Sequence, residues 1–129
     1  MTNKHFKYKE RLRSFQYAFR GIGILIQSQH NAWIHAFATM AVIIVGMLWG
    51  ISKEEWIGIV LTIVVVWAAE ALNTAFEYLA DAVNPSFHPL VKNAKDVAAG
   101  AVLLAAIGAV VIGVIIFGPH LAETIKAIR

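Results

Sequence analysis

The 129-residue sequence contains no cysteine. A disulfide, a thiolate metal site and a cysteine nucleophile are therefore excluded. Charged residues are scarce, at 15% of the chain, whereas hydrophobic residues make up 59%, above the roughly 45–50% of soluble domains. No GxxxxGK(S/T) loop is present, so a P-loop nucleotide site is also excluded. The composition favours a membrane protein of one domain's length, and we expect a single domain over 1–129.

The positive charge lies mostly in the first twenty residues. Six of the eleven Lys and Arg residues occur there: Lys4, Lys7, Lys9, Arg11, Arg13 and Arg20. In a hydrophobic chain such an arm favours an anionic membrane surface, so we expect no nucleic-acid partner. No short apolar core with a small-residue cleavage site follows it, so it is not predicted to be a signal peptide. Aromatic and aliphatic residues alternate with these charges, which predicts an amphipathic surface helix over 1–30. That helix either anchors the chain or takes part in substrate binding.

Three apolar stretches are long enough to span a membrane as helices, which takes about 20 residues. They cover 32–51, 56–80 and 97–117, and the pair Gly118-Pro119 is expected to end the third. Buried helices of a soluble protein are the alternative. The chain has too little polar sequence to cover two long uncharged runs, so we predict an all-α integral membrane protein.

The loop charges predict the orientation of these spans. The amino-terminal arm and the linker before the third span, which holds Lys92 and Lys95, are basic. The turn after the first span has Lys53 beside two Glu residues. We therefore expect the amino terminus to be cytoplasmic and the carboxyl terminus to lie outside.

Four polar residues interrupt the second stretch: Glu70, Asn73, Glu77 and Asp81. At about 100° per residue they project at about 0°, 300°, 340° and 20°, which is one narrow face. Glu70 lies roughly 21 Å along the helix from Trp56, which places this polar stripe at the cytoplasmic end of the span. Carboxylates in a membrane helix are costly unless they pair, hydrate or bind a cation, so they are functional candidates. A structural pairing with another helix is the alternative.

Lys95 and Asp96 stand at the start of the third span, at the depth of the stripe. A Lys binds phosphate and a nearby Asp can position it, although such a pair also caps helices. Further along, Ala101, Ala105, Ala109 and Gly113 recur every four residues. This ridge of small side chains predicts close helix packing, within the chain or between chains.

Two segments carry a family resemblance. Glu70-x-x-Asn73-x-Ala75-x-Glu77-x-x-x-Asp81, followed by Ala94-Lys95-Asp96-x-Ala98-Ala99-Gly100, closely resembles the bacterial diacylglycerol kinase / undecaprenol kinase family. The likeness extends to Tyr17-Ala18-Phe19-Arg20-Gly21 and to Asn31-x-x-x-His35, and it covers nearly the whole chain. The Asn31-x-x-x-His35 element looks more like the undecaprenol kinase branch.

The resemblance implies a homotrimeric lipid kinase that uses ATP and Mg²⁺. Glu70 would be the general base on the lipid hydroxyl, and Glu77 would hold the metal. Lys95, Asp96, Glu77, Tyr17 and Arg11 would contribute to nucleotide binding. Asn73, Asp81, Asn31 and His35 would orient the site or the substrate. These roles agree with the chemistry, since an attacking alcohol must be deprotonated and polyphosphate charge must be neutralised.

One position departs from the family pattern. The second metal-binding Glu of the family corresponds here to Gln29, and no Asp or Glu occurs between Glu10 and Glu54 to replace it. A Gln carbonyl can still bind a cation, but the loss of a charge lowers metal affinity. The sequence therefore leaves open a homologue with reduced or no activity, which would be a membrane scaffold. A proton- or cation-coupled transporter using Glu70 and Glu77 is a further alternative. The lipid alcohol, undecaprenol or diacylglycerol, stays undetermined.

Overall fold

The computed structural model of the chain describes residues 8–83 and 86–129, with the backbone alone of Lys9. These residues form four helices: α1 (Tyr8–Ser28), α2 (His30–Trp49), α3 (Lys53–Val83) and α4 (Pro89–Ile128). No strand occurs in the described ranges. Three of the helices, α2, α3 and α4, are long and apolar enough to cross a membrane. The predicted all-helical membrane fold is thereby confirmed.

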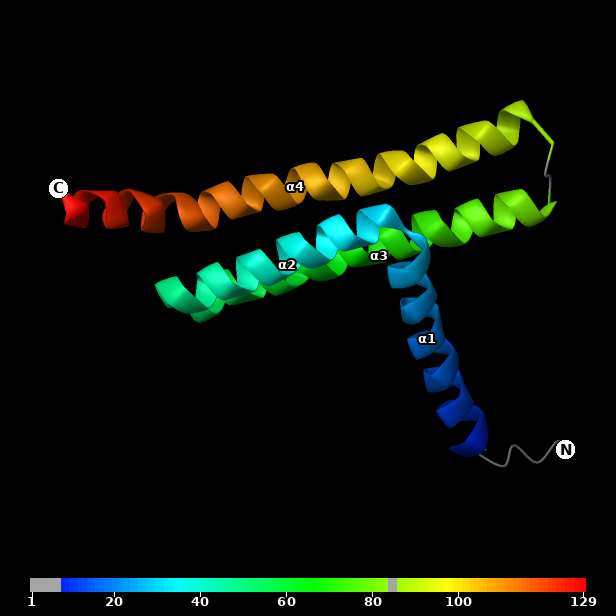
Figure 1. Cartoon of the computed structure of the whole chain (residues 1–129), viewed down its shortest axis with the longest axis horizontal. Coiled ribbons are helices and arrows are strands. Elements are labelled where there is room, and N and C mark those ends of the chain that lie inside the picture. The colour runs from blue at the N-terminus through cyan, green and yellow to red at the C-terminus, as the bar shows by residue number, and fades with distance from the viewer. Residues whose placement is uncertain (1–7, 84–85) are drawn as a thin grey trace, which may run out of the picture.

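The three apolar helices lie side by side, with α3 in contact with both neighbours (Figure 1). Helix α4 runs antiparallel to α3 and extends beyond it at its carboxyl end, and α2 packs against α3. Helix α1 leaves this bundle at a steep angle near the start of α2. We call the loop between α3 and α4 the hairpin end of the bundle, and the turn at residues 50–52 the turn end.

Helix α1 carries an exposed apolar stripe along its length. The large side chains Leu12, Phe15, Phe19, Ile22 and Ile26 are all exposed. Their spacing of three and four residues places them on one face of the helix. This arrangement fits a helix lying on a membrane surface. The first seven residues of the predicted helix 1–30 lie outside the described residues.

The turn end holds the one apolar core cluster of the described residues, formed by Ile51, Ile59 and Ile116. Gly50 makes the turn possible, because its φ of 62° is left-handed and favours a residue without Cβ. Ser52 then caps α3: its Oγ accepts from the Glu55 N–H at 3.2 Å, and Glu55 Oε2 accepts from the Ser52 N–H at 2.7 Å. This reciprocal pair is a capping box.

Helix α4 begins earlier than predicted from the sequence. His88 Nδ1 accepts a hydrogen bond from the Leu90 N–H at 3.2 Å, and Pro89 occupies the first helical turn, where its missing N–H costs nothing. The prediction that Lys92 and Lys95 lie in a linker was therefore wrong. Both lie inside α4, one and two turns from its start.

The prediction that Gly118-Pro119 ends the third span was also wrong, because α4 continues through Pro119 to Ile128. A proline disfavours helical geometry in the preceding residue mainly through that residue's Cβ and N–H. Gly118 has no Cβ, so part of this clash is absent. Beyond Pro119, the Thr124 hydroxyl donates to the His120 carbonyl at 2.8 Å within the continued helix.

Few side chains of the described residues are buried. The buried apolar ones are Leu25, Ala32, Ile51, Ile59, Val66 and Ile116, whereas many large apolar side chains on α2, α3 and α4 are exposed. An apolar surface of this extent suits contact with lipid or with other chains. Within the small-residue ridge, Ala101 is exposed, and Ala105, Ala109 and Gly113 are half-buried. The predicted close packing of this ridge stays a prediction.

Candidate active site

Glu70 is the most deeply buried large side chain among the described residues, with 0% of the residue exposed. It lies on α3, and its two carboxylate oxygens make no hydrogen bond in the structure. The nearest ionisable group is His35 on α2, whose Nε2 lies 3.6 Å from Glu70 Oε2. Buried carboxylates are usually hydrogen-bonded, and exceptions often mark a catalytic or ligand-binding role. Glu70 is therefore the centre of the candidate site.

One and two turns further along α3, Asn73 and Glu77 form a hydrogen-bonded cluster with Gln29. Asn73 Nδ2 donates to Glu77 Oε1 at 3.3 Å, and Gln29 Nε2 donates to Glu77 Oε2 at 3.2 Å. Gln29 stands at the N-cap position of α2 but makes no side-chain cap. Its amide is directed instead at α3. Both oxygens of Glu77 are thus bound by neutral amides, and Asn73 Oδ1 remains buried without a hydrogen-bond partner.

The stripe ends at Asp81, where it meets α4. Lys95 Nζ lies 3.0 Å from Asp81 Oδ1, and the two side chains are 38% and 70% exposed. This ion pair joins α3 to α4 at the hairpin end. Asp96, which we expected to help fix the nucleotide, pairs instead with Lys92 on its own helix. The structure brings Lys95 to the stripe, and Asp96 lines a cavity of about 410 Å³ together with Asp81 and Lys95.

A cavity of about 270 Å³ opens beside Glu70. Its polar lining comes from Asn31 and His35 on α2 and from Glu70 and Asn73 on α3. The side facing it on α4 is apolar and consists of Ala99, Val102, Leu103 and Ala106. The two α2 residues are four positions apart and therefore share a helix face. Asn31, predicted from the family element alone, is placed beside the buried carboxylate.

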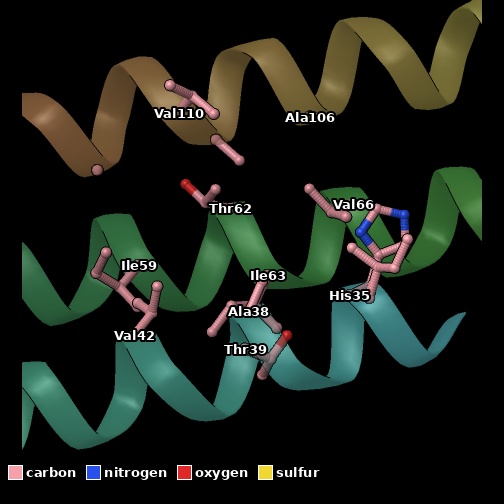
Figure 2. A pocket seen from close by; sticks show the side chains of 13 residues that line it. His35, Ala38, Thr39, Val42, Ile59, Thr62, Ile63, Val66, Ala106 and Val110 are labelled. Atoms are coloured by element: carbon pink, nitrogen blue, oxygen red, sulfur yellow. The ribbon is translucent and has the colours of Figure 1, made fainter. Parts of the chain in front are cut away.

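A second cavity of about 300 Å³ continues toward the turn end between α2, α3 and α4 (Figure 2). It shares Ile34, His35 and Ala106 with the first cavity. The remaining lining is almost wholly apolar and includes Val42, Ile59, Val66 and Val110. The two cavities together give a space with a polar end at Glu70 and an apolar extension.

Arg11 and Tyr17 are not brought to this cluster. Both lie on α1 with exposed side chains, and neither lines the cavities between α2, α3 and α4. Conversely, two residues were missed from the sequence. Trp67 packs edge-on against His35 with ring centroids 6.4 Å apart, and its Nε1 donates to Thr39 Oγ1 at 3.1 Å. The spacing of Thr39 four residues after His35 was a signal that both share one face of α2.

The fold and this cluster define a small integral membrane protein with a polar site between its spanning helices. The profile of the family described as prokaryotic diacylglycerol kinase matches residues 16–117. The chain is 43% identical over 109 residues to an undecaprenol kinase of Bacillus subtilis, covering 84% of this chain and 89% of that protein. It is 45% identical over 103 residues to a diacylglycerol kinase of Synechocystis sp., covering 79% of this chain and 59% of that protein.

The chain belongs to the prokaryotic diacylglycerol kinase family. The resemblance found in the sequence is therefore confirmed, and the class of the protein is that of a membrane lipid kinase. A kinase of this class uses a nucleotide phosphate donor and commonly a divalent metal.

The residues around Glu77 offer oxygen ligands to such a metal. No group of three or more His, Cys, Asp and Glu side chains within the described ranges could hold an ion. Mg²⁺ is usually held by one or two carboxylates, several waters and substrate phosphates, not by an all-protein cage. Glu77, the carbonyl of Gln29 and the unpartnered Asn73 Oδ1 are oxygen ligands of the required kind. The site fits a metal that is shared with a nucleotide.

Proposed function

We propose that the chain transfers the γ-phosphate of ATP to the hydroxyl of a membrane lipid alcohol. The observation that carries this proposal is the fully buried Glu70 carboxylate, which lies without a hydrogen bond in a cavity that continues into an apolar space. A hydroxyl entering the cavity is the donor that this carboxylate lacks. The apolar cavity that adjoins it suits the hydrocarbon of a lipid.

The proposed reaction is a single phosphoryl transfer. Glu70 accepts the hydroxyl proton as the lipid oxygen forms a bond to the γ-phosphorus, and the bond from that phosphorus to the β,γ-bridging oxygen breaks to release ADP. Asn73 orients Glu77 through its amide N–H. Glu77 and Gln29 would hold Mg²⁺, which when bound neutralises phosphate charge. Asn31 lines the cavity beside the hydroxyl.

Lys95 is the proposed phosphate contact. Its present partner is the largely exposed Asp81, and exposed ion pairs contribute only about 0–1 kcal/mol. An arriving phosphate can therefore take over the Lys95 ammonium at little cost. Asp96, Arg11 and Tyr17 are proposed to contact the nucleotide from positions outside the cluster, which requires α1 to lie over the site in the working assembly.

For the lipid, we propose undecaprenol ahead of diacylglycerol. The undecaprenol kinase relative is matched over 89% of its length, whereas the diacylglycerol kinase relative is matched over 59%. The chain would work as a homotrimer in a bacterial inner membrane, with a cytoplasmic amino terminus and an external carboxyl terminus. The small-residue ridge of α4, exposed or half-buried within the chain, and the exposed apolar faces support self-association.

The test is a kinase assay on the purified full chain in lipid vesicles, with labelled ATP and Mg²⁺ and with each alcohol in turn. We expect labelled undecaprenyl phosphate to form. Glu70→Gln should lower turnover by about 10²–10⁴-fold, the usual contribution of a general base. Glu54→Gln, which neutralises an exposed carboxylate on the same helix, should not change it. Labelling of neither alcohol would overturn the proposal.

A specific observation favours a second function, that of a homologue without catalytic activity. Gln29 supplies an amide where a second carboxylate would attract a metal, and its hydrogen bond already occupies one oxygen of Glu77. In that case the wild-type chain would label no lipid, and Gln29→Glu would restore labelling. Restoration by this single change would assign the chain a structural role in the membrane.

A further inference from the structure

A buried general base must lose its proton before the next turnover. The Glu70 side chain is 1% exposed, so it cannot return its proton directly to bulk water. The following inference rests on the proposed function, because it concerns the fate of the proton that Glu70 takes from the lipid.

Within the part of the chain that the structure describes, His35 is the one titratable group placed to receive that proton. Its Nε2 lies 3.6 Å from Glu70 Oε2, close enough for a proton transfer after a small closing movement. The His35 side chain is 15% exposed, and it lines both the polar cavity and the apolar cavity. It therefore connects the enclosed carboxylate with more accessible space.

The imidazole is held in place by the same two helices that carry the pair. Trp67 on α3 packs edge-on against it, with an interplanar angle of 64°. The Trp67 indole N–H in turn donates to Thr39 on α2 at 3.1 Å. Trp67 thus fixes the orientation of the His35 ring, and His35 Nε2 faces Glu70.

Among the described residues, no titratable group besides Glu70 and His35 lines the polar and the apolar cavity. The polar cavity contains Glu70 and His35 as its titratable residues, and the apolar cavity contains His35 alone. The residues that α4 presents to both cavities are Ala, Val, Leu and Gly side chains or backbone. Helix α1 contributes to neither lining. A charge on the imidazole would therefore be balanced by Glu70.

We propose that His35 is a positioning residue for Glu70 and the acceptor of its proton. The proton leaves the lipid hydroxyl for Glu70 Oε1 as the new phosphorus–oxygen bond forms. It then passes from the Glu70 carboxyl to the neutral Nε2 of His35, which restores the carboxylate and gives an imidazolium. Release of that proton to water regenerates the starting pair.

The first test is the pH profile of kcat for His35→Gln and for the control His30→Gln, which alters an exposed histidine at the start of α2. In the wild type, kcat should rise with pH, because only the neutral imidazole can accept the proton. In His35→Gln, kcat should fall by about tenfold or more and lose this rise. The KM for ATP should stay unchanged. An unchanged kcat and profile would overturn the inference.

Chemical rescue separates proton transfer from structural support. His35→Ala enlarges the polar cavity, and added imidazole should restore part of its kcat with a dependence on the concentration of neutral imidazole. A purely structural role gives no such dependence, and the absence of rescue in a folded variant would count against proton transfer.

A measurement without turnover separates this inference from the proposed function. The ring-nitrogen chemical shifts of His35 are followed by NMR at a fixed pH in the full chain, in Glu70→Gln and in the control Glu54→Gln. We expect the Nε2 signal to move in Glu70→Gln alone, because Nε2 faces the Glu70 carboxylate. If the wild type labels no lipid but the Nε2 signal moves, the proposed function fails and the pair stands. If lipid is labelled and the Nε2 signal does not move, the inference fails alone.

Discussion

Gln29 Nε2 donates a hydrogen bond to Glu77 Oε2 at 3.2 Å, so the residue that precedes α2 is tied to the middle of the polar stripe on α3. Asn73 binds the other oxygen of the same carboxylate. A partly buried carboxylate is costly without partners, and here two neutral amides supply them. Both oxygens of Glu77 therefore have hydrogen-bond partners without a cation, whereas the buried Asn73 Oδ1 has none.

Gln29→Glu should replace the hydrogen bond to Glu77 by a repulsion. The introduced carboxylate and that of Glu77 would lie side by side and repel each other until a cation binds. We expect Mn²⁺ affinity without nucleotide to rise about tenfold or more with the second anionic ligand, and the melting temperature without metal to fall. Titration by electron paramagnetic resonance and thermal unfolding with and without Mn²⁺ measure the two effects. Gln27→Glu, on the exposed surface of α1, is the control, and an equal gain there would show a non-specific charge effect.

Lys95 and Lys92 offer a matched pair on α4. Each forms an exposed ion pair, Lys95 with Asp81 on α3 and Lys92 with Asp96 on its own helix. Lys95→Ala should raise the KM for ATP about tenfold, the loss expected for one charge-assisted hydrogen bond of about 1.4 kcal/mol. Lys92→Ala should change it less than twofold. Steady-state kinetics with varied ATP make the comparison, and equal effects would contradict the assignment of Lys95 to phosphate.

Among the glycines of the described residues, Gly46 is the one whose added Cβ would meet the closest neighbours. A Cβ built there would lie 3.0 Å from the Trp56 ring and 3.1 Å from Ile51 Cδ1. Gly46→Ala should therefore destabilise the bundle by about 1–3 kcal/mol, as overpacking does. Gly21→Ala on α1 meets no atom within 4 Å and should stabilise by about 0.5–1 kcal/mol. Denaturation of the full chain in mixed micelles measures both, and a Gly46→Ala variant as stable as the wild type would refute the packing argument.

Ser52 is expected to matter for stability through its cap. Ser52→Ala removes the acceptor for the Glu55 N–H and should cost about 1 kcal/mol. Ser52→Asp keeps an acceptor at the same position and should recover most of that loss. The same unfolding experiment distinguishes them. A loss that Asp does not recover would show that the hydroxyl acts through something other than the cap.

The sequence was sufficient for the features that depend on local pattern. Three apolar runs gave three long apolar helices, and the offsets from Glu70 to Asp81 placed four polar groups on one face. The ends of α4 were predicted wrongly, because the usual effect of a residue on a helix end depends on the residues next to it. Pro119 did not end α4 because Gly118 precedes it, and α4 began before Lys92 because His88 and Pro89 form a good helix start.

Side-chain contacts between different helices could not be predicted from the sequence. The hydrogen bond from Gln29 to Glu77 spans 48 positions, and that from Trp67 to Thr39 spans 28. Both depend on the angle and depth at which α2 meets α3, which helical periodicity does not fix. The ion pair between Asp96 and Lys92 is local, since the two residues lie one turn apart on α4, and it was not predicted.

Helices α3 and α4 are joined by polar side-chain contacts near both ends of the bundle, and a cavity lies between these contacts. Lys95 and Asp81 close the hairpin end, while His120 Nε2 lies 3.1 Å from Glu55 Oε1 at the turn end, where its ring stacks on Trp49. The middle keeps the apolar cavity of Figure 2. Bending of α4 in its middle widens or narrows this cavity while the contacts at both ends persist. A bulky hydrocarbon chain can then enter from the side of the bundle without separation of α3 from α4.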